Sequence, residues 1–202
     1  MPTPTVPTDV TFWYDPRCPW AWVTSRWMVE LESQGLVHVR WQVMSLANLH
    51  EHDADYDATK FEIVRTSARA AAAAASVKGD EILGDVYTAL GRRIHVEKQT
   101  PDRDLVTAVF DELGLPLDLV DKVFTTQYDD YIRASHDAAV EAAGHDLGTP
   151  VIAYDGKAFF GPVLKAALTG DDASKLWDAM KLIAELDGVY EIKRSRPEGP
   201  IV

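Results

Sequence analysis

The chain has 202 residues, 47% of them hydrophobic, which is enough to build a substantial core in one domain or in a domain that carries an insertion. Its net charge of −12 excludes nucleic acid and anionic lipid as expected main partners, because phosphate-binding surfaces need clustered Lys and Arg. Residues 1–8 lack the basic and apolar regions of a signal peptide, and no later run reaches the ~18 apolar residues of a membrane span. We therefore expect a cytoplasmic protein with a frayed N-terminal leader and no membrane partner.

The chain contains a single cysteine, Cys18. One thiol cannot form an intramolecular disulfide, which suits a reducing compartment, and it cannot build a structural zinc site from thiolates. No glycine-rich turn follows a predicted strand, so we expect no nucleotide or other tightly bound cofactor. Any redox chemistry must use this one sulfur.

The first 45 residues predict a β-α-β unit. The apolar run 10–14 ends at Asp15-Pro16, as a buried strand followed by a turn does. Apolar residues in the next segment recur at spacings of three and four up to Gly35, which predicts an amphipathic helix: Trp20, Val23, Trp27 and Leu31. Alternating apolar and polar residues over 37–45 then predict a half-buried strand.

The rest of the chain predicts a helical block followed by a hairpin and a last helix. Residues 57–144 show helical periodicity, strongest at the run 70–75, and should hold four or five helices. Thr100-Pro101-Asp102 predicts a helix start with proline at the first helical position. Residues 151–154 and 157–160, joined by Asp155-Gly156, predict a β-hairpin, and 173–186 a closing helix.

This element order predicts an α/β protein with a thioredoxin-like fold, β-α-β then β-β-α, and an all-helical insertion. We assign residues 1–50 and 145–202 to the thioredoxin-like domain, and residues 51–144 to the inserted domain.

Cys18 is the candidate nucleophile because it lies between a predicted strand end and a predicted helix start, where Pro19 is expected at the first helical position. Unpaired backbone amides and the positive end of the helix dipole should favour the thiolate there, so we expect a lowered pKa for this thiol.

The segment around Cys18 resembles the active-site segment of the mycothiol-dependent nitroreductases of actinobacteria, which are DsbA-like proteins of the thioredoxin superfamily. The resemblance rests on residues 12–20 and 22–27 and continues in order along the chain through 43–47, 87–91, 93–95, 148–150, 159–164 and 175–178. It implies a DsbA-like fold and mycothiol, a low-molecular-weight thiol, as cosubstrate. The expected partners are thus a small thiol and an electrophilic substrate, and a homodimer is left open.

The sequence departs from that family at Ala21. Dithiol relatives carry a second cysteine there, and alanine cannot attack a mixed disulfide. We therefore expect a monothiol variant, Cys-Pro-Trp-Ala, in which an outside thiol releases the substrate from Cys18. An engineered substitution at Ala21 is the alternative, and the departure puts nitroreductase activity itself in question.

Thr149-Pro150 resembles the cis-proline loop that faces the active-site cysteine in thioredoxin folds. The resemblance implies that the Thr149 backbone contacts a bound thiol. The alternative is an ordinary trans proline at the start of a strand. Trp20 could form a wall of the site, with the other nearby tryptophans in the core. His95, which the resemblance places near the cleft, could hydrogen-bond the sulfur or act structurally. His50 lies where it could reach the cleft.

Other polar groups carry weaker expectations. The motif His50-Glu51-His52-Asp53 lacks the spacing of metal ligands on one helix face, so we expect no metal site. Three aspartates are interpreted as solvated helix faces: Asp129, Asp130 and Asp137. Lys193, Arg194 and Arg196 in the C-terminal tail would bind a carboxylate or nothing, and we favour the second.

Three functions compete. The leading one is a thiol-dependent oxidoreductase that uses Cys18 in a monothiol mechanism. The second is a thiol transferase or isomerase, since kappa-class glutathione transferases and 2-hydroxychromene-2-carboxylate isomerases share this plan without an enzyme disulfide. The third is a non-catalytic thiol-binding protein that retains the fold for recognition only.

Overall fold

Four strands form one sheet in the order β2-β1-β3-β4, in a computed structural model that describes residues 6–202. The part of the expected leader before residue 6 lies outside the described residues, and from Thr8 the chain is already in a strand. β1 pairs with β2 in parallel and with β3 antiparallel, and β3 pairs with β4 antiparallel. The strands are β1 (Thr8–Tyr14), β2 (Val37–Val43), β3 (Val151–Tyr154) and β4 (Lys157–Phe160).

The helices follow the predicted order, with one between β1 and β2, a block between β2 and β3, and one after β4. They are α1 (Pro19–Ser33), α2 (Leu46–Leu49), α3 (Ala58–Lys78), α4 (Leu83–Gly91), α5 (Arg103–Glu112), α6 (Leu119–Val123), α7 (Asp129–Ala143) and α8 (Gly170–Ala184). A 3₁₀ turn, η1 (Asp80–Ile82), precedes α4, and a π-helical turn, η2 (Arg92–Val96), follows it. The α/β class, the parallel β-α-β unit and the hairpin are confirmed. No described helix is long and apolar enough to cross a membrane.

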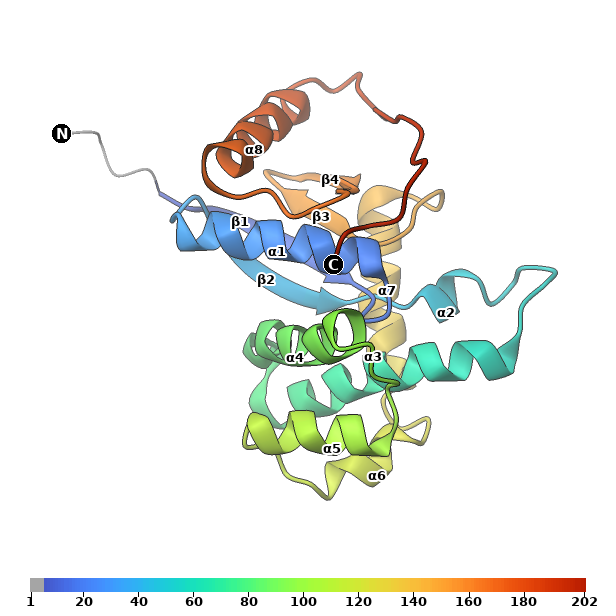
Figure 1. Ribbon diagram of the computed structural model, residues 1–202. Helices are drawn as coiled ribbons and strands as arrows, with labels where there is room; N and C mark the ends of the chain where they lie inside the picture. Colours follow the sequence, from blue (N-terminus) through green and yellow to red (C-terminus); the bar gives the residue numbers. More distant parts are fainter. Residues whose placement is uncertain (1–5) are drawn as a thin grey trace.

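The helices form two groups around the sheet (Figure 1). α1 and α8 pack against each other, and Trp27 of α1 donates a hydrogen bond from Nε1 to the Ala173 carbonyl at 3.1 Å. α7 contacts β2, β3 and β4, whereas α3 to α6 lie together below the sheet in Figure 1. The alanine run 70–75 of α3 is buried, because small side chains let the neighbouring helices approach closely.

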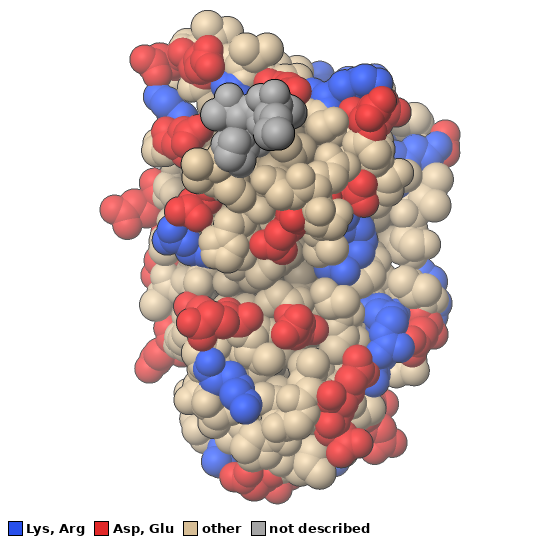
Figure 2. Space-filling model, turned by 90° about the vertical axis from the view of Figure 1, so that its left-hand side faces the viewer, with Lys and Arg blue, Asp and Glu red and all other residues tan. Residues whose placement is uncertain are grey.

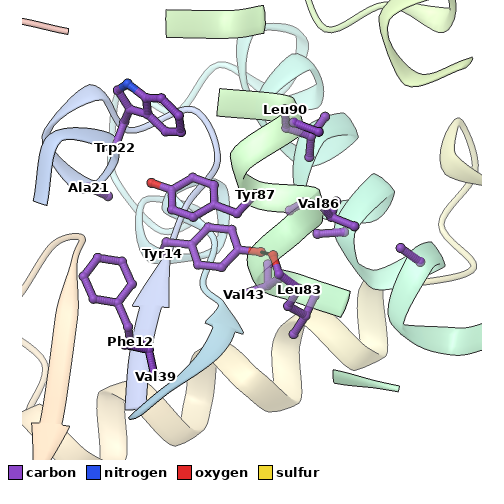
Figure 3. Close-up of a cluster of buried hydrophobic side chains, with 14 of the residues drawn as sticks. Phe12, Tyr14, Ala21, Trp22, Val39, Val43, Leu83, Val86, Tyr87 and Leu90 are labelled. Atoms are coloured by element: carbon purple, nitrogen blue, oxygen red, sulfur yellow. Dashed lines mark hydrogen bonds between the residues drawn. The ribbon is translucent and has the colours of Figure 1, made fainter. Parts of the chain in front are cut away.

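The core between the sheet and α4 fixes the position of α1 (Figure 3). Tyr14 of β1 stacks on Tyr87 of α4, with ring centroids 3.7 Å apart, and the edge of Trp22 packs against Tyr87 at 5.9 Å. A side chain on Gly91 would meet the Trp22 ring at 2.2 Å, so glycine permits this contact. The first turns of α1 are thereby held against the helical layer.

Two sequence predictions about the helical block are wrong in detail. The helix expected to start at Thr100-Pro101 starts two residues later, because the Asp102 side chain caps it by accepting a hydrogen bond from the Leu105 amide at 3.0 Å. Asp129 is not simply solvated: its carboxylate accepts two hydrogen bonds from the buried guanidinium of Arg69, at 2.6 and 2.9 Å. Asp130 and Asp137 are exposed as expected.

Candidate active site

Cys18 is the N-cap residue of α1, with Pro19 in the first turn. Its sulfur accepts a hydrogen bond from the Ala21 amide at 3.4 Å, so the sulfur occupies the place of an ordinary capping oxygen. The thiol donates to the Thr149 carbonyl at 3.5 Å. These two contacts join the start of α1 to the loop before β3, residues 131 positions apart in the chain.

The predicted lowering of the Cys18 pKa is wrong for this structure. Only 6% of Cys18 is exposed, and this burial raises the pKa of the thiol; the negative charge of Asp15 raises it further. The nearby Thr149 hydroxyl and the Ala21 and Trp20 amides lower the pKa of the thiol but do not outweigh burial. The resting sulfur is therefore a protonated thiol, with donors already arranged around the place where a thiolate would form.

This pKa direction predicts how Cys18 should react with iodoacetamide. Only the thiolate is nucleophilic, so the rate should rise with pH up to the pKa of the thiol, and burial places that pKa above the free-thiol value of about 8.5. We expect the rate of alkylation, followed by intact mass, to be still rising at about pH 9, where a free thiol begins to level off. Cys18→Ser is the control, and a plateau near neutral pH would contradict the prediction.

The Thr149–Pro150 peptide bond is cis, as the resemblance implied. Thr149 is 4% exposed, and its Oγ1 has no hydrogen-bond partner among the described residues, although it lies close enough to lower the pKa of Cys18. A buried polar atom without a partner usually marks strain or an absent ligand. The Thr149 hydroxyl and carbonyl thus offer a donor and an acceptor beside the sulfur.

Trp20 lies in the first turn of α1 and is half-buried against the core. The guanidinium of Arg196, from the C-terminal tail, lies over its ring at 5.4 Å from the centroid. The other tryptophans near Cys18 are core residues, as expected: Trp13, Trp22 and Trp27. Trp20 is therefore the tryptophan of this group that is partly exposed, and it lies in the helical turn that Cys18 caps, a position compatible with the predicted wall.

His95 lies beside the site but does not contact the sulfur. Its Nε2 donates a hydrogen bond to the Pro16 carbonyl at 2.8 Å, and its ring stacks on Trp22 at 5.8 Å. Burial lowers the pKa of His95 to about 4, with smaller contributions from the positive charges of Arg17 and Lys98. A neutral imidazole bonded to the loop before Cys18 is placed to hold that loop rather than to donate a proton.

His50 is removed from these contacts. It ends α2, where Nδ1 lies 2.8 Å from an Asp53 carboxylate oxygen and the ring stacks on Phe61 at 6.0 Å. Glu51 of the same motif binds Arg133 through two hydrogen bonds, at 2.8 and 2.9 Å. The motif's side chains are thus engaged in local ion pairs between the α2 region and α7.

The sequence did not predict a role for two residues near the site, Asp15 and Tyr87. The sequence predicted only a turn at Asp15. Its side chain is fully buried and accepts hydrogen bonds from the Arg17 and Leu46 amides, both at 2.7 Å. Burial raises the pKa of this carboxyl group to about 6. Tyr87 directs its hydroxyl toward Trp22 and Ala21, while Tyr14 points the other way (Figure 3). An acid at the end of an apolar strand was the available signal for Asp15; nothing in the sequence singled out the Tyr87 hydroxyl.

Two cavities of the described residues lie away from the sulfur. A groove of about 610 Å³ runs between α1, β2 and α4, lined in part by Glu32, Trp41, Asp80 and Asp85. A small cavity of about 40 Å³ lies between α2, α3 and α7. Cys18 lines neither of these two cavities, in agreement with its low exposure.

Solved structures with the same fold include thiol enzymes. The cytosolic disulfide reductase DsbM from Pseudomonas aeruginosa, solved with GSH, aligns with a TM-score of 0.56 at 17% identity, over 86% of this chain and 99% of that chain. A 2-hydroxychromene-2-carboxylate isomerase aligns with a TM-score of 0.61 at 12% identity, over 88% of this chain and 95% of that chain. At these identities the likeness concerns the fold alone, and it confirms the predicted DsbA-like thioredoxin fold.

Sequence comparison leads to a family. "Uncharacterized protein Rv2286c" from Mycobacterium tuberculosis (strain ATCC 25618 / H37Rv) is 29% identical over 205 residues, covering 96% of this chain and 84% of its own length. Residues 17–194, which include Cys18 and the cis-proline loop, match the family described as "Rv2466c-like: Mycothiol-dependent nitroreductase Rv2466c". The predicted class, an enzyme of the thiol-dependent oxidoreductases, is confirmed through this family. The chain belongs to the Rv2466c-like family of mycothiol-dependent nitroreductases.

Proposed function

We propose that this protein is a monothiol oxidoreductase in which Cys18 exchanges disulfides with a small thiol, with mycothiol as the cosubstrate. The observation that carries the proposal is the pairing of Cys18, as N-cap of α1, with Thr149 of the cis-proline loop, while Ala21 occupies the position of a second thiol. A thiol placed there is able to form a mixed disulfide and unable to resolve it within the same chain.

The proposed cycle has two balanced steps. Deprotonated Cys18 attacks one sulfur of a small disulfide, so that a protein–substrate S–S bond forms, the original S–S bond breaks, and one thiolate leaves with its electron pair. A second small thiol then attacks the substrate sulfur of the mixed disulfide, which restores the Cys18 thiolate and yields a new small disulfide. The net reaction exchanges the outside thiol for the thiolate released in the first step, and Cys18 is regenerated, so the protein needs no second cysteine.

The neighbouring residues have separate roles in this proposal. The Ala21 amide, which already donates to the sulfur, stabilises the thiolate, and the Thr149 hydroxyl supplies a further donor. Pro19 starts the helix, Pro150 directs the Thr149 backbone toward the sulfur, and Trp20 offers an aromatic surface to the substrate. His95 positions the loop before Cys18, whereas His50, held by Asp53 at the end of α2, has no role in this cycle.

We further propose the division into a thioredoxin-like domain, residues 1–50 and 145–202, and an inserted helical domain, residues 51–144. The substrates are a small thiol and a small electrophile or disulfide, with no tightly bound cofactor, in a cytoplasmic protein. A homodimer is compatible with this function and is not required by it.

The test is intact-mass analysis after exposure to oxidised mycothiol. We expect the mass to rise by one mycothiol unit on the wild-type chain, no adduct on Cys18→Ser, and full release when reduced mycothiol is added. The adduct should persist without added thiol, because Ala21 cannot displace it. If no adduct forms on a chain that still binds mycothiol, the exchange cycle is wrong.

That negative result would favour a second function, transferase or isomerase chemistry on a bound thiol. Two observations support this alternative: Ala21 removes the second thiol, and burial keeps Cys18 protonated at neutral pH. In such an enzyme the cosubstrate's own sulfur is the nucleophile, and Cys18→Ser would retain part of the activity. Complete loss of activity in Cys18→Ser would count against it.

A further inference from the structure

Most cations of this acidic chain are already paired with carboxylates. Figure 2 shows acidic and basic side chains interspersed on one face of the molecule. The Arg40–Asp9 pair, with Nη2 3.1 Å from Oδ2, is one example of these ion pairs. Among the described Lys and Arg side chains, six form no ion pair: Arg17, Arg26, Lys78, Lys98, Arg194 and Arg196. In a protein of net charge −12, a cation that forms no ion pair remains available to bind an anionic ligand.

Three of these cations lie near residues that flank Cys18 or contact the loop before it. Arg17 precedes the sulfur directly, and Arg17 and Lys98 both lie close enough to His95 to lower its pKa. Arg196 lies over the Trp20 ring. Arg17 is half-exposed and the other two are exposed, so their charged groups can reach a ligand from solvent.

Arg26 also forms no ion pair, but its guanidinium is already bound by neighbouring side chains. Its guanidinium lies over Trp22 at 4.1 Å and donates to the Thr88 and Ser25 hydroxyls, both at 3.2 Å. Arg196 has the same kind of aromatic contact without those hydrogen bonds among the described residues. A guanidinium on an aromatic face keeps its N–H donors free in its own plane, which suits a planar carboxylate.

The C-terminal tail holds Arg196 in this place. After α8 the chain returns and ends beside α1 (Figure 1), where the Ile201 amide donates to the Lys165 carbonyl at 2.7 Å. Lys165 also forms an ion pair with Glu198, two residues after Arg196. Both anchors connect the tail to the loop that follows β4, so the guanidinium is presented from a segment tied down on one side.

We propose that Arg196, with Arg17 and Lys98 nearby, forms an anion-binding rim at Cys18 that selects small electrophiles or disulfides carrying a carboxylate. The inference rests on the proposed function, since it takes Cys18 as the attacking thiol. The overall charge of the chain repels anions, and the buried Asp15 adds to that repulsion near the sulfur. A local rim of cations without ion pairs makes the electrostatic potential positive where a substrate approaches Cys18, so that an anionic substrate is attracted there.

The experiment compares Cys18 alkylation by iodoacetate, which is anionic, and by iodoacetamide, a neutral reagent of similar size, at one pH and low salt. The measured quantity is the ratio of the two rates, iodoacetate over iodoacetamide, from intact mass. Arg196→Gln should lower this ratio by about threefold to fivefold, in line with the strength of an exposed ion pair. Added salt should lower the wild-type ratio too, because it screens exposed charges.

Arg194→Gln is the matched control, since it removes the same charge from the same tail without the Trp20 contact. We expect the control to keep the wild-type ratio. Equal ratios in wild type, Arg194→Gln and Arg196→Gln would overturn the anion-binding rim while leaving Cys18 a reactive thiol. An equal fall in both variants would also overturn it, because net charge alone would then explain the effect. No reaction of Cys18 with either reagent or with oxidised mycothiol would overturn the proposed function and the rim with it.

Discussion

Ala21→Cys is expected to convert the long-lived mixed disulfide on Cys18 into a short-lived one. The Ala21 amide already lies 3.4 Å from the Cys18 sulfur, and the side chain three residues on lies in the same first turn of α1. A thiol at that place would displace the bound thiol within the molecule and form a disulfide with Cys18. Because the attack becomes intramolecular, release without added thiol should accelerate by at least about a hundredfold.

The measurement is the lifetime of the mycothiol adduct by intact mass, together with the loss of two hydrogens that marks the new disulfide. Ala21→Ser is the control, since it has a similar size and no sulfur, and its adduct should persist as in the wild type. An adduct on Ala21→Cys that lasts as long as the wild-type adduct would show that the first turn of α1 does not bring the two sulfurs together.

Replacing Arg69 should cause the largest loss of stability among the substitutions considered. Its side chain is 2% exposed, connects α3 to α7 through two hydrogen bonds to Asp129, and forms an ion pair with Glu62 within α3. Arg69→Met keeps most of the apolar volume but leaves both carboxylates unpaired. Removing one partner of a fully buried pair costs about 3–5 kcal/mol, and the partial exposure of both acids reduces this to about 2–3 kcal/mol.

Urea unfolding at neutral pH measures the expected loss of about 2–3 kcal/mol in the free energy of unfolding. In thermal unfolding the same loss should lower the Tm by about 4–12 °C for a chain of this size. Arg69→Lys should recover part of the loss, since it restores the charge without the two-pronged contact to Asp129. Arg103→Met is the matched control, because its pair with Asp121 is exposed and should contribute little. If both methionine variants unfold at the wild-type midpoint, the Arg69 network does not stabilise the fold.

Local periodicity was sufficient to predict the architecture. The β-α-β unit, the helical block and the hairpin with its Asp155-Gly156 turn were all readable, because alternation and helical spacing are properties of neighbouring residues. The hairpin turn could be predicted from its two residue types. Asp155 and Gly156 both have positive φ, at 49° and 73°, a conformation that Asp and Gly adopt readily in such turns. The start of α5 was misplaced because Thr100 and Asp102 are both good caps, and only the Asp102 contact to the Leu105 amide decides between them.

For the candidate site, the sequence by itself determined that one sulfur at a helix start, with Ala21 beyond it, allows only monothiol chemistry. The tertiary structure alone decided the protonation state of that sulfur, because its burial, the largest cause of the raised pKa, comes from the packing of distant segments. It also decided that His95 binds the Pro16 carbonyl and that Arg196 lies on Trp20. A helix terminus is a local feature and can be read from neighbouring residues, whereas desolvation and long-range contacts exist only once the chain has folded.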